Sequence, residues 1–123
     1  MKYEDFLTRI IEEGIESAKE DYAGTTPAKT IKREGAVQGF LTCKDCTPEQ
    51  LVELYQAAGE KVNNAYREQA KDYWHWRCYQ AEIEWVCNVV SAMLANEGSK
   101  PLLPHLPTGN GVRKASSILA SES

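Results

Sequence analysis

Residues 73–94 constrain the fold more than any other stretch, because they contain all three tryptophans and neither glycine nor proline. Placed on a helix at about 100° per residue, their hydrophobic side chains fall on two sides. The first side holds Trp76, Tyr79, Ile83, Val86, Cys87, Val90 and Leu94. The second side holds Trp74, Cys78, Ala81, Trp85, Val89 and Ala92. A helix that is apolar on two sides must be covered on two sides. We therefore expect a central helix that also packs against another protomer.

Length and composition limit the possible classes of protein. At 123 residues the chain is expected to form a single domain, 1–123, large enough to bury a core. Its net charge of −4 disfavours DNA or RNA as the main partner. No apolar run approaches the roughly 18 residues that a membrane-spanning helix needs. Four cysteines without a secretory signal are typical of reduced thiols, so we predict a cytoplasmic protein.

The first half of the chain predicts a helix followed by a β-hairpin. Residues 3–22 show helical spacing of apolar side chains, which ends at a segment containing glycine and proline. In residues 28–43, β-branched side chains lie on both sides of Glu34-Gly35, and this pattern predicts a short hairpin.

A second long helix is predicted just before the central one. Thr47 is its expected N-cap, Pro48 its first residue and Gln50 the reciprocal partner of a capping box. The apolar stripe continues to about residue 70. Residues 71–72 are either a tight turn, which would pair the two long helices as an antiparallel hairpin, or part of a helix that runs straight into the next.

The last quarter of the chain is expected to be an extended tail with a short helix. Prolines make residues 101–107 extended, 108–111 form a turn, 112–119 form the helix, and the chain is frayed from about 120. The predicted fold is therefore mostly α with a small β element, an α+β arrangement that forms an oligomer through helix packing.

A line of polar residues runs between the two apolar sides of the central helix. It consists of Tyr73, Arg77, Gln80, Glu84, Asn88 and Ser91. A solvated stripe is the simpler interpretation. On a helix that is otherwise apolar, however, such a line favours a cleft or a buried polar seam. Arginine is a preferred donor to phosphate, and neighbouring aromatic rings can stack on a base.

Residues 108–114 offer a second candidate site. The segment begins at Thr108. Asn110 would cap the terminal helix, and Arg113 and Lys114 would bring two cations to the N-terminus of that helix. Helix N-termini attract anions. The alternative is an ordinary turn in the tail.

Two metal sites are weaker alternatives. Cys43 and Cys46 with His75 and Cys78 would make a zinc set, although buried cysteines are commonly small hydrophobic residues.

Three carboxylates, Glu12, Glu13 and Glu16, could hold magnesium and look like half of the motif of all-α nucleotide pyrophosphohydrolases. The other half of that motif is missing, and an acidic outer face explains them better. We predict neither a metal nor another cofactor, and no catalytic residue.

Three segments together resemble the Thoeris anti-defence sponges of phages and prophages. They are Tyr73-Trp-x-Trp-Arg-Cys-Tyr79, Glu84-Trp-Val-Cys-Asn-Val-Val-Ser91 and Arg113-Lys-Ala115. The order of elements matches over nearly the whole chain. The resemblance implies a symmetric oligomer, a dimer or a larger assembly such as a hexamer, with long helices packed across the interface. It also implies that cyclic ADP-ribose-type signals are sequestered there without cleavage, and that some members hold cyclic oligonucleotides of CBASS defence at a separate site.

The resemblance also implies roles for individual residues. Asn88 would hydrogen-bond the ligand and Arg113 would meet its phosphates. The position of Cys78 would suit a larger, stacking aromatic, so the cysteine departs from that pattern.

We therefore expect a cytoplasmic, non-enzymatic oligomer that sequesters a small cyclic nucleotide. Tyr73 or Trp74 would stack a base, and Arg77, with Arg113 and Lys114, would pair with phosphates. The alternatives are the magnesium-dependent hydrolase and a phage accessory protein that binds a protein partner. In the accessory protein, the polar line would be exposed to solvent.

Overall fold

The computed structural model describes residues 2–96, and in this part of the chain it contains four α-helices and no strand. They are α1 (Tyr3–Asp21), α2 (Pro27–Thr42), α3 (Pro48–Arg67) and α4 (Tyr73–Asn96). The three predicted helices in this range are confirmed to within a few residues at each end. The predictions for 101–107, 108–111 and 112–119 lie outside the described residues.

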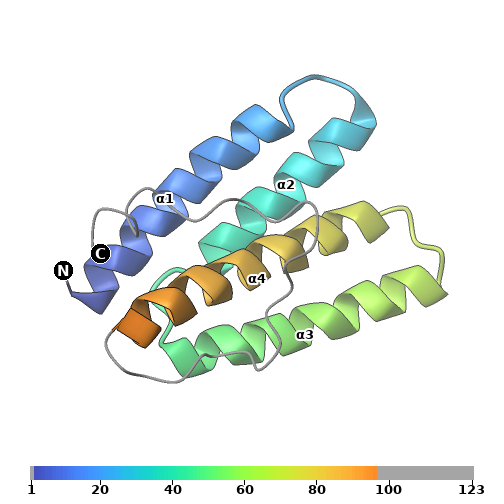
Figure 1. The fold of residues 1–123 in the computed structure, drawn as a ribbon. Coiled ribbons are helices and arrows are strands. Elements are labelled where there is room, and N and C mark those ends of the chain that lie inside the picture. Colours follow the sequence, from blue (N-terminus) through green and yellow to red (C-terminus); the bar gives the residue numbers. More distant parts are fainter. Residues whose placement is uncertain (1, 97–123) are drawn as a thin grey trace.

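Helix α4 lies at the centre of the arrangement. It contacts α2 and α3 along much of its length, while α1 lies mainly on α2 and touches α4 only briefly. Figure 1 shows α3 and α4 running antiparallel, as predicted, with α1 and α2 as the second pair. None of the four helices in the described range is both long and apolar enough to cross a membrane.

The predicted hairpin at 28–43 is wrong, because this segment is helix α2. The side chain of Thr26 caps its start by accepting a hydrogen bond from the Lys29 backbone N–H at 3.3 Å, and Pro27 follows in the first turn. Gly35 and Gly39, one turn apart, face the backbone of α4. A Cβ atom on Gly39 would lie 2.7 Å from the Tyr79 carbonyl oxygen. The glycines thus let two helices approach closely, whereas the sequence pattern had suggested a turn.

The capping box predicted for α3 is confirmed. The Thr47 hydroxyl accepts a hydrogen bond from the Gln50 backbone N–H at 3.2 Å, and the Gln50 side chain accepts one from the Thr47 N–H at 2.8 Å. From this start α3 runs alongside α4, and its buried residues are Leu51, Ala58, Val62 and Ala65.

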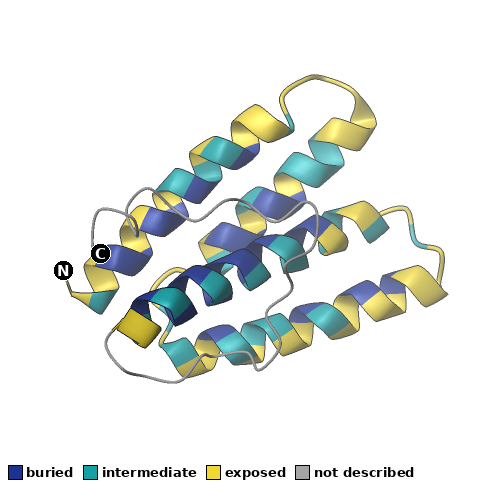
Figure 2. Ribbon diagram, in the orientation of Figure 1, coloured by how far each residue is buried: buried dark blue, intermediate teal, exposed yellow. Residues whose placement is uncertain are grey.

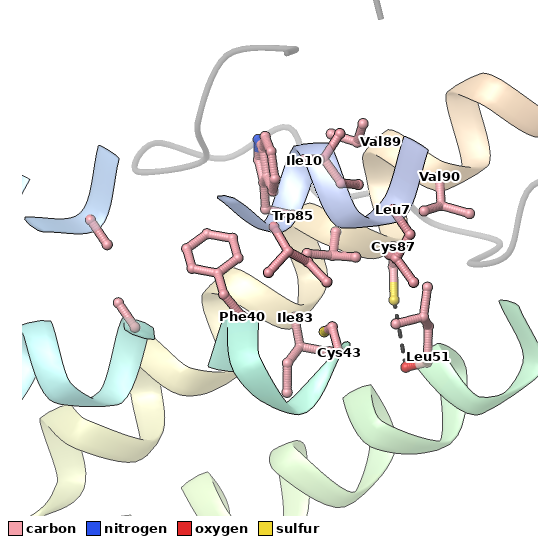
Figure 3. Close-up of a cluster of buried hydrophobic side chains, with 14 of the residues drawn as sticks. Leu7, Ile10, Phe40, Cys43, Leu51, Ile83, Trp85, Cys87, Val89 and Val90 are labelled. Carbon is pink, nitrogen blue, oxygen red and sulfur yellow. Dashed lines mark hydrogen bonds between the residues drawn. The ribbon is translucent and has the colours of Figure 1, made fainter. Parts of the chain in front are cut away.

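Most of both apolar sides of α4 is buried within the single chain (Figure 2), although Trp74 at the start of the second side is 52% exposed. On the first side Ile83 is fully buried, and on the second side Trp85 is only 3% exposed. The ring of Phe40 on α2 meets Trp85 edge to face, with centroids 5.8 Å apart, and fills the space beside Gly14 (Figure 3). The second apolar side therefore does not require another protomer. The predicted oligomer stays a prediction.

Candidate functional site

A row of aromatic rings lies where α3 ends and α4 begins. The Tyr66 ring is 6.0 Å from that of Tyr73, which in turn is 5.1 Å from the ring of Trp74. Two of these side chains are largely open to solvent, Tyr66 at 71% and Trp74 at 52% exposed. Exposed aromatic rings in a row provide surfaces on which flat ligands can stack.

Cations lie beside this aromatic row. The Lys32 ammonium on α2 is 4.9 Å from the centroid of the Trp74 ring, a cation–π contact. Arg77 lies three residues after Trp74, hence on the same side of α4, and is exposed. The start of α4 thus combines a stacking surface with two positive charges that could meet phosphate oxygens.

The polar line on α4 descends from the surface into the core. Arg77 is exposed, Gln80, Glu84 and Asn88 are half-buried, and Ser91 is only 2% exposed. This gradient agrees with a partly buried polar seam and disagrees with a fully solvated stripe. We call these five residues, Arg77, Gln80, Glu84, Asn88 and Ser91, the polar seam.

Helix α3 contributes Tyr55 to the polar seam. Burial raises the pKa of the Glu84 carboxyl, while hydrogen bonding with the Tyr55 hydroxyl and the charge of Arg77 act in the opposite direction. Burial, together with Glu84, raises the pKa of Tyr55. The carboxylate is thus held in a partly desolvated position between a hydroxyl from α3 and the electrostatic influence of Arg77.

Asn88 carries an unsatisfied acceptor. Its Oδ1 atom is buried and has no hydrogen-bond partner within the described part of the chain. A buried polar atom without a partner costs roughly 1–3 kcal/mol, so structures rarely keep one without a reason. A donor from a ligand or from a water molecule would remove that cost.

Cys78 does not belong to the polar seam. It is 7% exposed, and its Sγ atom lies 3.8 Å from the hydroxyl oxygen of Tyr22, at the end of α1. Burial raises the pKa of this thiol, although Tyr22 and the charges of Lys32 and Arg77 act against that rise. The ligand position that the resemblance implies for residue 78 is therefore occupied by a thiol that faces α1.

The predicted site residues are only partly brought together. Tyr73, Trp74 and Arg77 share the first turns of α4, and Asn88 lies three turns further along the polar seam. Thr108, Arg113 and Lys114 lie outside the described residues. Sequence reasoning missed Lys32, because a hairpin would have placed it elsewhere, and Tyr55, because it reaches the polar seam from another helix.

Neither metal alternative finds a site in residues 2–96, where no three His, Cys, Asp or Glu side chains are placed to hold an ion. Among the carboxylates of α1, Glu16 instead forms an exposed ion pair with Lys19 at 3.7 Å. Burial raises the pKa of the Cys43 thiol, and the neighbouring Cys87 raises it further. Burial also raises the pKa of Cys87, to about 12. Neither thiol takes part in a disulfide.

Two hollows in the described surface lie away from the polar seam. One, of about 220 Å³, is lined by Tyr3, Leu7, Cys46 and other residues near the start of α3. Another, of about 190 Å³, lies beside Trp76 at the turn between α3 and α4. The predicted ligand residues on α4, Tyr73, Trp74, Arg77 and Asn88, line neither hollow, so a ligand bound along them would need a second wall.

Comparison of the chain with protein-family models, with curated proteins and with solved structures finds no match.

Proposed function

We propose that this protein binds a small cyclic nucleotide, such as a cyclic ADP-ribose isomer or a cyclic oligonucleotide, and sequesters it without cleavage. The observation that carries the proposal is the half-exposed Trp74 ring with the Lys32 ammonium 4.9 Å from its centroid and Arg77 on the next turn. A base stacks on the ring and the phosphates pair with the two cations.

The other proposed contacts extend along the polar seam. The unsatisfied Oδ1 atom of Asn88 accepts a hydrogen bond from the ligand. Arg113 and Lys114 add cations from the C-terminal part of the chain, and a second protomer of a homo-oligomer supplies the missing wall. Binding alone is sufficient for the function, because removing the free signal shifts its receptor toward the unliganded state. In this way the protein inhibits an anti-phage defence that depends on the signal.

One observation also favours a second candidate, a surface for a protein partner. Tyr66 and Trp74 are exposed aromatic side chains of the kind that dominate protein interfaces. The half-buried polar seam favours the nucleotide instead, since it would have no role in such an interface.

The first experiment is a thermal-shift screen of the purified protein against cyclic ADP-ribose isomers and cyclic di- and trinucleotides. Bound ligand is then released by heating and identified by chromatography. We expect one compound to stabilise the protein and to be recovered intact. A chemically altered compound would support an enzyme, and no stabilisation by any of them would contradict the proposal and leave the protein partner as the better candidate.

Two variants connect the result to the site. Trp74→Ala should weaken binding about 10- to 100-fold, since stacking contributes roughly 1–3 kcal/mol per base. Leu41→Ala is the matched control, because Leu41 is equally exposed, at 54%, on another part of the surface. Asn88→Leu should also weaken binding, while the protein without ligand becomes slightly more stable because a buried unsatisfied acceptor is removed.

A further inference from the structure

Glu84 is an unexpected group on a surface that we propose for phosphates. Lys32 and Arg77 favour an anionic ligand, whereas a carboxylate on the same helix face repels phosphate oxygens. Its position is nevertheless defined, because it is half-buried and engaged by the Tyr55 hydroxyl of the neighbouring helix. A carboxylate held in this way suits a part of the ligand that carries no negative charge and can donate hydrogen bonds.

The carboxylate has acceptor capacity left for such a ligand. Its two oxygens offer about four acceptor positions, and the Tyr55 hydroxyl beside it can use only one of them. The unsatisfied Oδ1 atom of Asn88 lies one turn further along the same face. Two acceptors one helical turn apart suit a group with neighbouring donors, and the hydroxyls of a ribose are such a group. Acidic side chains bind ribose hydroxyls in the same way in dinucleotide-binding folds.

The spacing along α4 indicates which part of the ligand reaches Glu84. At 1.5 Å per residue, Glu84 lies roughly 10 Å beyond Arg77 and roughly 15 Å beyond Trp74 along the helix axis. A base stacked on Trp74 cannot also reach the carboxylate. When the phosphates pair with Arg77, Glu84 contacts the part of the ligand that lies beyond the phosphates. In a cyclic dinucleotide or a cyclic ADP-ribose, that part is a second sugar.

We infer that Glu84, positioned by Tyr55, accepts hydrogen bonds from ribose hydroxyls and makes the site selective for ribonucleotides over deoxyribonucleotides. This inference rests on the proposed function, because it assigns a role within the same ligand surface. It adds a contact with the sugar, made by Glu84 and positioned by Tyr55, to the proposed contacts with the base and the phosphates.

The test measures the dissociation constants of cyclic ADP-ribose and cyclic di-AMP, each beside its deoxyribose analogue, by calorimetry. The wild-type protein should bind the ribose form of its preferred compound about tenfold or more tightly than the deoxyribose form, as expected for a hydrogen bond to a charged acceptor. Glu84→Gln should reduce this ratio to less than about threefold, since it retains the shape but removes the charge. Tyr55→Phe should reduce the ratio in the same direction. Glu53→Gln, an exposed glutamate on α3, is the matched control and should leave the ratio unchanged.

The ratio between the dissociation constants of the deoxyribose and ribose forms distinguishes a lost sugar contact from a general loss of binding. A variant that is merely less well folded weakens both forms equally and leaves the ratio intact, and this outcome at Glu84 and Tyr55 would overturn the inference. Equal binding of ribose and deoxyribose forms by the wild-type protein would also overturn it, while leaving the proposed function in place. If neither form of either compound binds to the wild-type protein and no other compound of the thermal-shift screen stabilises it, the proposed function fails and the role of Glu84 fails with it.

Discussion

Gly35 and Gly39 determine how closely α2 can approach α4. At both positions the neighbouring atoms belong to the backbone of α4, namely the carbonyl groups of His75 and Tyr79, which cannot rotate away as a flexible side chain can. An added methyl group would therefore push the two helices apart and disturb the core around Phe40 and Trp85.

Gly35→Ala should lower the free energy of unfolding by about 1–3 kcal/mol, the usual cost of overpacking. Gly59→Ala is the matched control on α3, where the new Cβ atom would lie 3.2 Å from the mobile amide nitrogen of Gln80. This second change should leave stability unchanged or raise it by up to about 1 kcal/mol, because alanine is the better helix former. Urea unfolding curves measure both effects. Equal effects of the two substitutions would contradict the close packing of α2 against α4.

Single residues of the site could be predicted where helical periodicity alone places them. Arg77 and Asn88 fall on one line at 100° per residue, and the structure places both on the polar seam. Lys32 and Tyr55 could not be predicted in this way, because they reach the site from other helices. Periodicity gives the face of one helix, while contacts between helices depend on the packing of the whole bundle.

At the scale of the elements, a signal for helix α2 was present in the sequence. Thr26-Pro27 before α2 repeats the Thr47-Pro48 pair before α3, and both threonines cap their helices. The β-branched residues and Gly35 outweighed that signal and suggested a hairpin. Glycine is ambiguous because it permits both a turn and a close approach of two backbones. Only the position of α4 decides between these roles.

Thr47→Ala should lower the free energy of unfolding by roughly 1 kcal/mol, within the range of 0.5–2 kcal/mol for a lost N-cap. The substitution removes the hydroxyl that accepts from the Gln50 N–H at 3.2 Å. Thr8→Ala serves as the control, since Thr8 lies within α1 with its side chain exposed. Its hydroxyl donates a hydrogen bond to the Glu4 carbonyl one turn earlier. That change should be neutral or slightly stabilising. A loss at Thr47 no greater than at Thr8 would show that the capping box does not stabilise α3.

At the scale of the whole molecule, α4 is the element around which the other three helices pack. Its two apolar sides predicted a central position, and that prediction is confirmed, since α2 and α3 pack along it and α1 touches it. The same two sides also predicted a second protomer. Within one chain, however, Ile83 and Val90 on the first side are fully buried, and Trp85 and Val89 on the second side are 3% and 4% exposed. An oligomer would consequently join surfaces that are already folded.

This arrangement gives a prediction that separates folding from assembly. The midpoint of urea unfolding should be the same over about a hundredfold range of protein concentration, because the burial of Trp85 and Val89 needs no partner chain. Light scattering on the same samples reports the mass in solution, so an oligomer that forms from folded chains will be seen without any shift of the midpoint. A midpoint that rises with concentration would show that assembly stabilises the fold. In that case the core around α4 would be incomplete in one chain.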